Sequence, residues 1–163
     1  MRMIFGMIGA LALFACAERA PATSEYLTLS GDAPLIIAHR GASGSLPEHT
    51  LEAYTLAIQH GADFIEPDLV MTKDGVLIAR HDRFLSTTTN VSDRPEFADR
   101  KRVSETFDGD RDDWWAEDFT LEEIKTLRAR QPYAGRSKAY DDQFEIPTFV
   151  EIADLALASG IGL

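Results

Sequence analysis

The sequence predicts an α/β fold in which two strands run parallel. Residues 35–38 and 64–70 are short apolar runs, and the segment between them, residues 48–60, has the periodicity of a helix. Short continuous apolar runs are typical of strands that are buried on both faces of a sheet. A strand, a helix and a second strand in this order favour parallel pairing with a crossover helix. The order of these three segments is therefore the main evidence for the fold class.

The predicted helix at residues 48–60 has one apolar face, and Gly61 is a natural stop at its C-terminal end. The apolar face consists of Leu51, Tyr54, Ala57 and Ile58. A hairpin is predicted after the second strand, because Asp74-Gly75 separates that strand from a further apolar run at residues 76–79.

Two more helices are predicted in the second half of the chain. Thr120 and Glu123 form a capping-box pattern, which opens a helix that extends to residue 128. Thr148 opens another helix, which ends at residue 159 before Gly160.

The remaining segments of the second half are irregular. Residues 86–118 lack periodicity and are interpreted as an insertion or a long surface excursion, of a length that is often functional. Residues 131–145 are interpreted as a polar loop, and residues 161–163 as the first residues of a third strand.

The formal net charge of −11 argues against nucleic acid as a partner. A protein that binds nucleic acid needs clustered Lys and Arg to neutralise phosphates. The same acidity would repel an anionic small molecule, unless a bound cation or a local Arg reversed the sign of the charge at the site.

Residues 1–22 are predicted to be a signal peptide. Arg2 gives a positive start, and residues 3–14 are an apolar run that is too short to span a bilayer. Small residues follow, so cleavage is expected after Ala17 or Ala22. A retained membrane anchor is the alternative that the short run disfavours. We expect an exported protein with a linker at residues 23–33 and one domain at residues 34–163.

Cys16 is the only cysteine of the chain. Residues 13–16 resemble a bacterial lipobox, so a second alternative is that Cys16 becomes a lipidated N-terminus. The protein is then expected in the periplasm or lipid-anchored in the bacterial envelope. In both cases no disulfide framework and no thiolate metal site is expected.

Polar side chains with catalytic potential follow three of the apolar runs: His39, Glu66 with Asp68, and His81. Active sites of parallel α/β folds lie at the C-terminal ends of strands. Because Glu66 and Asp68 are two residues apart in the predicted strand, both side chains should point to the same side. Two inward carboxylates are costly without a cation, and their oxygens suit Ca²⁺ or Mg²⁺. A solvent-facing acidic pair and structural histidines remain the alternative.

Four ordered motifs resemble the glycerophosphodiester phosphodiesterase family, especially its exported bacterial, calcium-type branch. They are His39-Arg40-Gly41, Pro47-Glu48-His49-Thr50, residues 61–75 around Glu66-Pro67-Asp68, and His81-Asp82 followed by residues 87–90. The resemblance extends from about residue 35 to the end of the chain. It implies a TIM (β/α)8 barrel of the phospholipase C-like phosphodiesterase type.

The resemblance also implies a reaction. Family members hydrolyse glycerophosphodiesters to sn-glycerol 3-phosphate and an alcohol, in lipid and glycerol metabolism. It assigns Glu66 and Asp68 as metal ligands, with Ca²⁺ favoured over Mg²⁺, and His39 and His81 as the acid–base pair. Arg40 is implied to contact the substrate phosphate, and Asp82 to orient His81. The partner is thus a small-molecule glycerophosphodiester, and a membrane is involved only through a lipid anchor at the N-terminus.

Two of these assignments have a structural alternative. Glu48 is implied to order the site, although it also suits the start of a helix. Arg40 is alternatively a surface charge.

The chain also departs from the family pattern. His49 stands where the family usually has Asn, and it is expected to shift Glu48 or to add a charge near the phosphate. The family's third acidic metal ligand and a following Lys lie on the strand that residues 161–163 begin. We therefore expect a truncated, N-terminal part of the barrel that is inactive by itself.

Two other functions remain open at this point. A phospholipase D of the lysolipid or sphingomyelin type shares the two histidines and the acidic ligands. The chain could also be a non-catalytic phosphate-binding protein or an inactive fragment.

Overall fold

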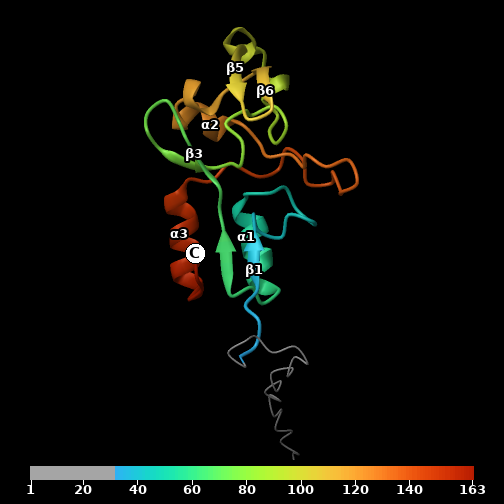
Figure 1. The fold of residues 1–163 in the computed structure, drawn as a ribbon, viewed down its shortest axis with the longest axis vertical. Helices are drawn as coiled ribbons and strands as arrows, with labels where there is room; N and C mark the ends of the chain where they lie inside the picture. The colour runs from blue at the N-terminus through green and yellow to red at the C-terminus, as the bar shows by residue number, and fades with distance from the viewer. Residues whose placement is uncertain (1–31) are drawn as a thin grey trace, which may run out of the picture. The chain divides into compact units, whose positions relative to one another are not determined.

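The computed structural model describes residues 32–163. The predicted signal peptide, Cys16 and most of the predicted linker lie outside the described residues. The chain divides into two compact units, Met1–Pro34 and Leu35–Leu163. Only residues 32–34 of the first unit are described, and these contain no helix or strand. All described helices and strands belong to the second unit (Figure 1). No helix among residues 32–163 has the length and apolarity needed to cross a bilayer.

The predicted strand–helix–strand unit is present. β1 (Ile37–His39) pairs in parallel with β2 (Phe64–Glu66), and α1 (Leu51–Gln59) connects them. The side chain of Thr50 caps α1 by accepting a hydrogen bond from the backbone N–H of Ala53. The helix therefore begins three residues later than predicted, because residues 48–50 form the loop that precedes it.

β1 is not buried on both faces, which corrects the expectation from its apolar sequence. Leu35, Ile36 and Ile37 are 66%, 55% and 60% exposed. Among residues 32–163 the only strand that pairs with β1 is β2, so one edge of β1 has no partner strand in this part of the chain.

Residues 64–70 do not form one strand as predicted. β2 ends at Glu66, and the separate strand β3 (Leu69–Met71) pairs antiparallel with β4 (Leu77–Ala79). Pro67 lies at the break, and it cannot donate a ladder hydrogen bond. The hairpin predicted at Asp74-Gly75 is confirmed, with Gly75 at φ 83° in its turn.

The last helix and the third strand position agree with the sequence. α3 (Phe149–Ser159) begins with a capping box between Thr148 and Glu151, and Gly160 ends it at φ 66°. Gly162 forms a parallel bridge with Phe64 of β2. α1 and α3 lie side by side, and a small apolar cluster joins them to β2 and β4. Its buried members are Tyr54, Ile65, Ala79, Ile152 and Ala156.

Residues 86–118 are more ordered than an irregular insertion. They contain the 3-10 helices η1 (Val91–Asp93), η2 (Pro95–Arg100) and η3 (Ala116–Asp118), and the hairpin β5 (Arg102–Thr106) and β6 (Gly109–Asp113). Figure 1 shows this hairpin near α2 (Leu121–Thr126). α2 begins with the predicted Thr120–Glu123 capping box and ends two residues before residue 128.

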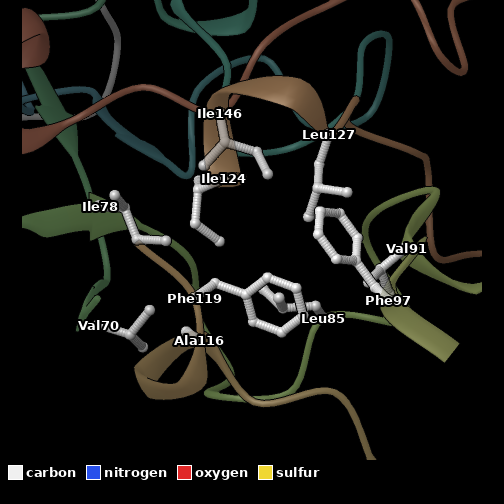
Figure 2. Close-up of a cluster of buried hydrophobic side chains, with 10 residues drawn as sticks. All are labelled: Val70, Ile78, Leu85, Val91, Phe97, Ala116, Phe119, Ile124, Leu127 and Ile146. Atoms are coloured by element: carbon white, nitrogen blue, oxygen red, sulfur yellow. The ribbon is translucent and has the colours of Figure 1, made fainter. Parts of the chain in front are cut away.

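The segment also contributes to the larger core cluster, so it is not only a surface excursion. Figure 2 shows Val91, Phe97 and Ala116 among the buried side chains of this cluster. Their partners come from β3, β4, α2 and the connecting segments: Val70, Ile78, Leu85, Phe119, Ile124, Leu127 and Ile146. Residues 131–145 contain no helix or strand, as predicted for a loop.

Candidate active site

The parallel register of β1 and β2 brings two predicted site residues together at the C-terminal ends of the strands. His39 is the register partner of Glu66. The Nε2 atom of His39 lies 4.0 Å from Oε2 of Glu66. His39 is largely exposed, whereas Glu66 is partly buried. An imidazole and a carboxylate thus meet at one edge of the sheet.

Asp68 completes a group of three side chains that could hold a metal ion. Ligand atoms of His39, Glu66 and Asp68 all lie within 4.8 Å of one another. The sequence predicts that strand alternation turns the side chains of Glu66 and Asp68 to the same side. Asp68 instead follows the end of β2, and contacts with Arg40 and His49 hold its side chain. His39, for which the family resemblance implies proton transfer, is also close enough to the two carboxylates to contact a metal ion bound between them.

The environment of one carboxylate oxygen in this group indicates whether these residues suit a bound cation. Oε2 of Glu66 is buried and has no hydrogen-bond partner among the described residues. A buried carboxylate oxygen without a donor is costly, and a divalent cation would satisfy it. The donor set of carboxylate oxygens fits Ca²⁺ or Mg²⁺.

Arg40 links the two acidic parts of the site. Its Nη1 lies 3.2 Å from Oε1 of Glu48, and its Nε lies 3.2 Å from Oδ2 of Asp68. The side chain of Arg40 is only 14% exposed, which excludes the alternative of a surface charge. Glu48 is buried and precedes the N-cap residue Thr50, so it acts here as the partner of Arg40 and not as a residue of the first helical turn.

Gly41 allows helix α1 to approach this corner. Its φ is 77°, and a Cβ atom at this position would lie 2.8 Å from the carbonyl carbon of Ala53. The backbone of the His39-Arg40-Gly41 motif therefore packs directly on the first turn of α1, where any side chain at residue 41 would overlap with the helix.

His81 lies outside the three-residue group and has its own carboxylate. Nδ1 of His81 is 3.0 Å from Oδ1 of Asp82, which is within hydrogen-bond distance. Arg40 and Glu48 line a cavity of about 270 Å³. His81 and Asp82 line the same cavity, so it extends from Arg40 to the second histidine. A larger cavity of about 590 Å³ lies on the β5 side of His81, away from the three-residue group.

The sequence did not single out Tyr54 and Arg80 as site residues, although both are fully buried there. The Tyr54 hydroxyl is 2.8 Å from Nδ1 of His49, and Nη1 of Arg80 donates to the Glu48 carbonyl at 3.2 Å. Burial raises the pKa of Tyr54 and lowers that of Arg80 to about 10. Tyr54 was assigned to the apolar face of a helix. The only signal for Arg80 was a charge directly after an apolar run.

His49 does not add a charge near the phosphate, which corrects the expectation from its sequence position. Burial, followed by the neighbouring charges of Arg80 and Arg40, lowers the pKa of His49 to about 2. The ring is therefore neutral at physiological pH. Its Nε2 lies 3.3 Å from Oδ2 of Asp68, so this contact is a hydrogen bond to a carboxylate and not an ion pair.

A comparison with family models matches residues 39–161 to the Glycerophosphoryl diester phosphodiesterase family. The chain belongs to this family. The four motifs predict this family, and all of them lie within the matched range.

Curated relatives in the family are similar over most of this chain. A glycerophosphodiester phosphodiesterase of Arabidopsis thaliana, GDPD6, is 46% identical over 142 residues, which are 85% of this chain and 38% of that protein. A glycerophosphodiester phosphodiesterase of Haemophilus influenzae is 41% identical over 126 residues, which are 71% of this chain and 32% of that protein. The chain thus spans less than half the length of these relatives.

Solved structures of the family share the fold. The glycerophosphodiester phosphodiesterase of Agrobacterium tumefaciens aligns with a TM-score of 0.55 at 29% identity, over 78% of this chain and 44% of that one. A phosphodiesterase of Oleispira antarctica, solved with the product sn-glycerol-3-phosphate, aligns with a TM-score of 0.55 at 30% identity, over 80% and 42%. The β1–α1–β2 unit and the parallel bridge from Phe64 to Gly162 form part of the TIM-barrel phosphodiesterase fold. The four motifs imply the same fold.

Proposed function

We propose that the protein hydrolyses glycerophosphodiesters to sn-glycerol 3-phosphate and an alcohol, with the help of a divalent cation. The observation that carries the proposal is the group of His39, Glu66 and Asp68, in which the buried Oε2 of Glu66 has no donor among the described residues. The names of the relatives and the product found in the Oleispira antarctica structure support this substrate class over a lysophospholipase D, a sphingomyelinase D or a non-catalytic binding protein.

Glu66 and Asp68 would hold the cation, with Ca²⁺ favoured as in the calcium-type branch of the family. When bound, the cation supplies positive charge that offsets the two carboxylates and polarises the phosphoryl group. This contribution meets the requirement set by the net charge of −11.

Arg40 would bind a phosphoryl oxygen of the substrate. Its Nε donates to Nε2 of His39 and forms an ion pair with Asp68, and its Nη1 donates to Glu48. Nη2 forms no hydrogen bond with the described residues. Arg40 also lines the 270 Å³ cavity. The two carboxylates thus fix the guanidinium plane and leave one donor for the ligand.

His39 and His81 would exchange the protons of the reaction. Asp82 accepts a hydrogen bond from Nδ1–H of His81, which leaves Nε2 of His81 to accept or donate a proton. His39 lies beside Glu66, and its Nε2 accepts a hydrogen bond from Nε of Arg40 at 3.3 Å. One histidine can therefore receive the proton of the nucleophile while the other gives one to the leaving alkoxide.

The test is hydrolysis of a panel of glycerophosphodiesters by the purified protein, followed by detection of sn-glycerol 3-phosphate. Chelation should abolish turnover, and added Ca²⁺ should restore it better than Mg²⁺. Turnover that is insensitive to chelator would exclude the metal role, and a product other than sn-glycerol 3-phosphate would exclude this reaction.

We also propose that the protein is exported to the periplasm or anchored by lipid to the bacterial envelope. The support is the apolar run at residues 3–14 and the small residues around Cys16. Cell fractionation and the mass of the mature N-terminus test this proposal. A protein that retains Met1 in the cytoplasmic fraction would contradict it.

A further inference from the structure

Asp68 differs from the other residues of the proposed metal site in how its side chain is held. His39 and Glu66 belong to β1 and β2, whose ladder fixes their backbone direction. Asp68 lies between the end of β2 and the start of β3. Its orientation therefore depends on side-chain contacts.

Those contacts converge on one oxygen of the carboxylate. Nε of Arg40 lies 3.2 Å from Oδ2 of Asp68, and Nε2 of His49 lies 3.3 Å from the same atom. Oδ1 of Asp68 forms no hydrogen bond with the described residues. The hydrogen bond from His49 and the ion pair with Arg40 both occupy Oδ2, which leaves Oδ1 as the oxygen available to a cation.

His49 is itself held from its other side. A carboxylate only accepts hydrogen bonds, so the contact with Asp68 requires the proton on Nε2 of His49. In a neutral ring Nδ1 is then an acceptor, and the Tyr54 hydroxyl at 2.8 Å donates to it. The hydrogen bonds run from Tyr54 to His49 to Asp68 in a single direction.

Tyr54 and His49, the two residues that precede Asp68 in this series of hydrogen bonds, are both held in place by the surrounding protein. Tyr54 is on α1 with its ring in the buried cluster that contains Ile65 and Ile152. His49 is fully buried, and its backbone N–H donates to the Arg40 carbonyl at 3.2 Å. Its φ of 58° is in the left-handed region, which His tolerates better than most residues.

We infer that His49 and Tyr54 are positioning residues that orient Asp68, so that its Oδ1 faces the cation. The inference rests on the proposed metal-dependent function and assigns a role to His49, which stands where the family usually has Asn. Partners that orient a metal-ligating carboxylate typically change metal affinity by about 10–100-fold when they are removed. Preorganisation of the ligand is the physical reason for this effect.

The decisive experiment compares two substitutions of equal shape. Gln and Met have similar length and the same disadvantage at φ 58°, but only Gln carries an N–H that can reach the position of Nε2. We expect His49→Met to weaken Ca²⁺ binding by about 10–100-fold in calorimetric titration, and His49→Gln to stay within about threefold of the wild type. Equal affinity of both variants and the wild type would overturn the inference.

Tyr54→Phe provides a second variant that keeps the ring in the core and removes only the hydroxyl. We expect it to melt cooperatively and to bind Ca²⁺ about tenfold more weakly than the wild type. If the substitutions at residue 49 do not fold, an unchanged affinity of Tyr54→Phe would decide against the role.

The tautomer of His49 is a readout that needs no metal. Long-range ¹H–¹⁵N correlation of the imidazole should show the proton on Nε2, and a proton on Nδ1 would contradict the direction of the hydrogen bonds. The outcomes also separate the two proposals. A wild-type protein that binds no Ca²⁺ and has no activity would reject the proposed function, whereas normal binding by all variants would reject only the role of His49 and Tyr54.

Discussion

His39 and Glu66 are opposite each other in the parallel ladder of β1 and β2, and their side chains approach to 4.0 Å between Nε2 and Oε2. The register alone produces this relationship, because a shift of one residue would turn one of the two side chains to the other face of the sheet. The proposed proton-transfer and metal-binding functions therefore depend on the same strand pairing.

The first prediction concerns the two histidines of the proposed acid–base pair. His39→Ala and His81→Ala should each reduce turnover by about 10²–10⁴-fold, since a positioned general acid or base contributes that much. The purified variants are compared with the wild type by kcat on one glycerophosphodiester. His60→Ala is the control, because His60 is exposed at the end of α1 and should leave kcat unchanged. Near-normal turnover of either site variant would remove that histidine from the mechanism.

Glu66→Gln should weaken Ca²⁺ binding. The substitution keeps the size of the side chain but removes the charge that a hard cation requires at the buried Oε2. A loss of at least about tenfold in affinity is expected from calorimetric titration. Glu52→Gln makes the same change at an exposed position of the first turn of α1 and should bind as the wild type does. Equal affinity of the two variants would mean that Glu66 is not a ligand.

Gly41→Ala should destabilise the protein, because a Cβ atom would overlap with α1 and because the φ of 77° disfavours any side chain. We expect a loss of about 1–3 kcal/mol in the free energy of unfolding, or several degrees in Tm. Gly44→Ala is the matched control, since a Cβ at Gly44 would meet no atom of the described part of the chain within 4 Å. If both variants melt at the same temperature, the close approach of Gly41 and α1 is not important for stability.

The ion pair of Glu123 with Arg100 should make stability depend on pH in the acid range. The hydrogen bond from Arg100 is the main reason that the pKa of Glu123 falls from 4.5 to about 2. A lowered pKa in the folded state stabilises the protein above the unfolded value of 4.5, and the stabilisation is lost as pH falls toward 2. Glu123→Gln should therefore cost up to about 1 kcal/mol at pH 7 and progressively less below pH 4.5.

Urea unfolding of wild type and Glu123→Gln at several pH values measures this difference. Glu122→Gln, in the same turn, makes the same change of charge where residues 32–163 offer no Arg partner, and it should cost less at pH 7. A difference between wild type and Glu123→Gln that stays constant from pH 7 to pH 3 would contradict the predicted coupling.

The helix ends and the hairpin turn could be predicted because a few neighbouring residues determine each of them. The Thr120 and Thr148 caps, the Gly160 stop and the Asp74-Gly75 turn all act through hydrogen bonds or dihedral angles within a few residues. Residues 86–118 were harder to predict, because their 3-10 helices and hairpin carry no long period. They fold by placing Phe97 and Ala116 against β3, β4 and α2.

The sequence by itself determined the strand–helix–strand order and the family, and it named the proposed site residues except Tyr54 and Arg80. The tertiary structure decided how those side chains are used. It ended β2 at Glu66, directly before Pro67, so that Asp68 is held by Arg40 and His49 instead of by strand alternation. It also buried His49, which made the ring neutral, and brought Tyr54 and Arg80 to it. The physical reason is that protonation and orientation depend on desolvation and on neighbours distant in sequence, which no local pattern records.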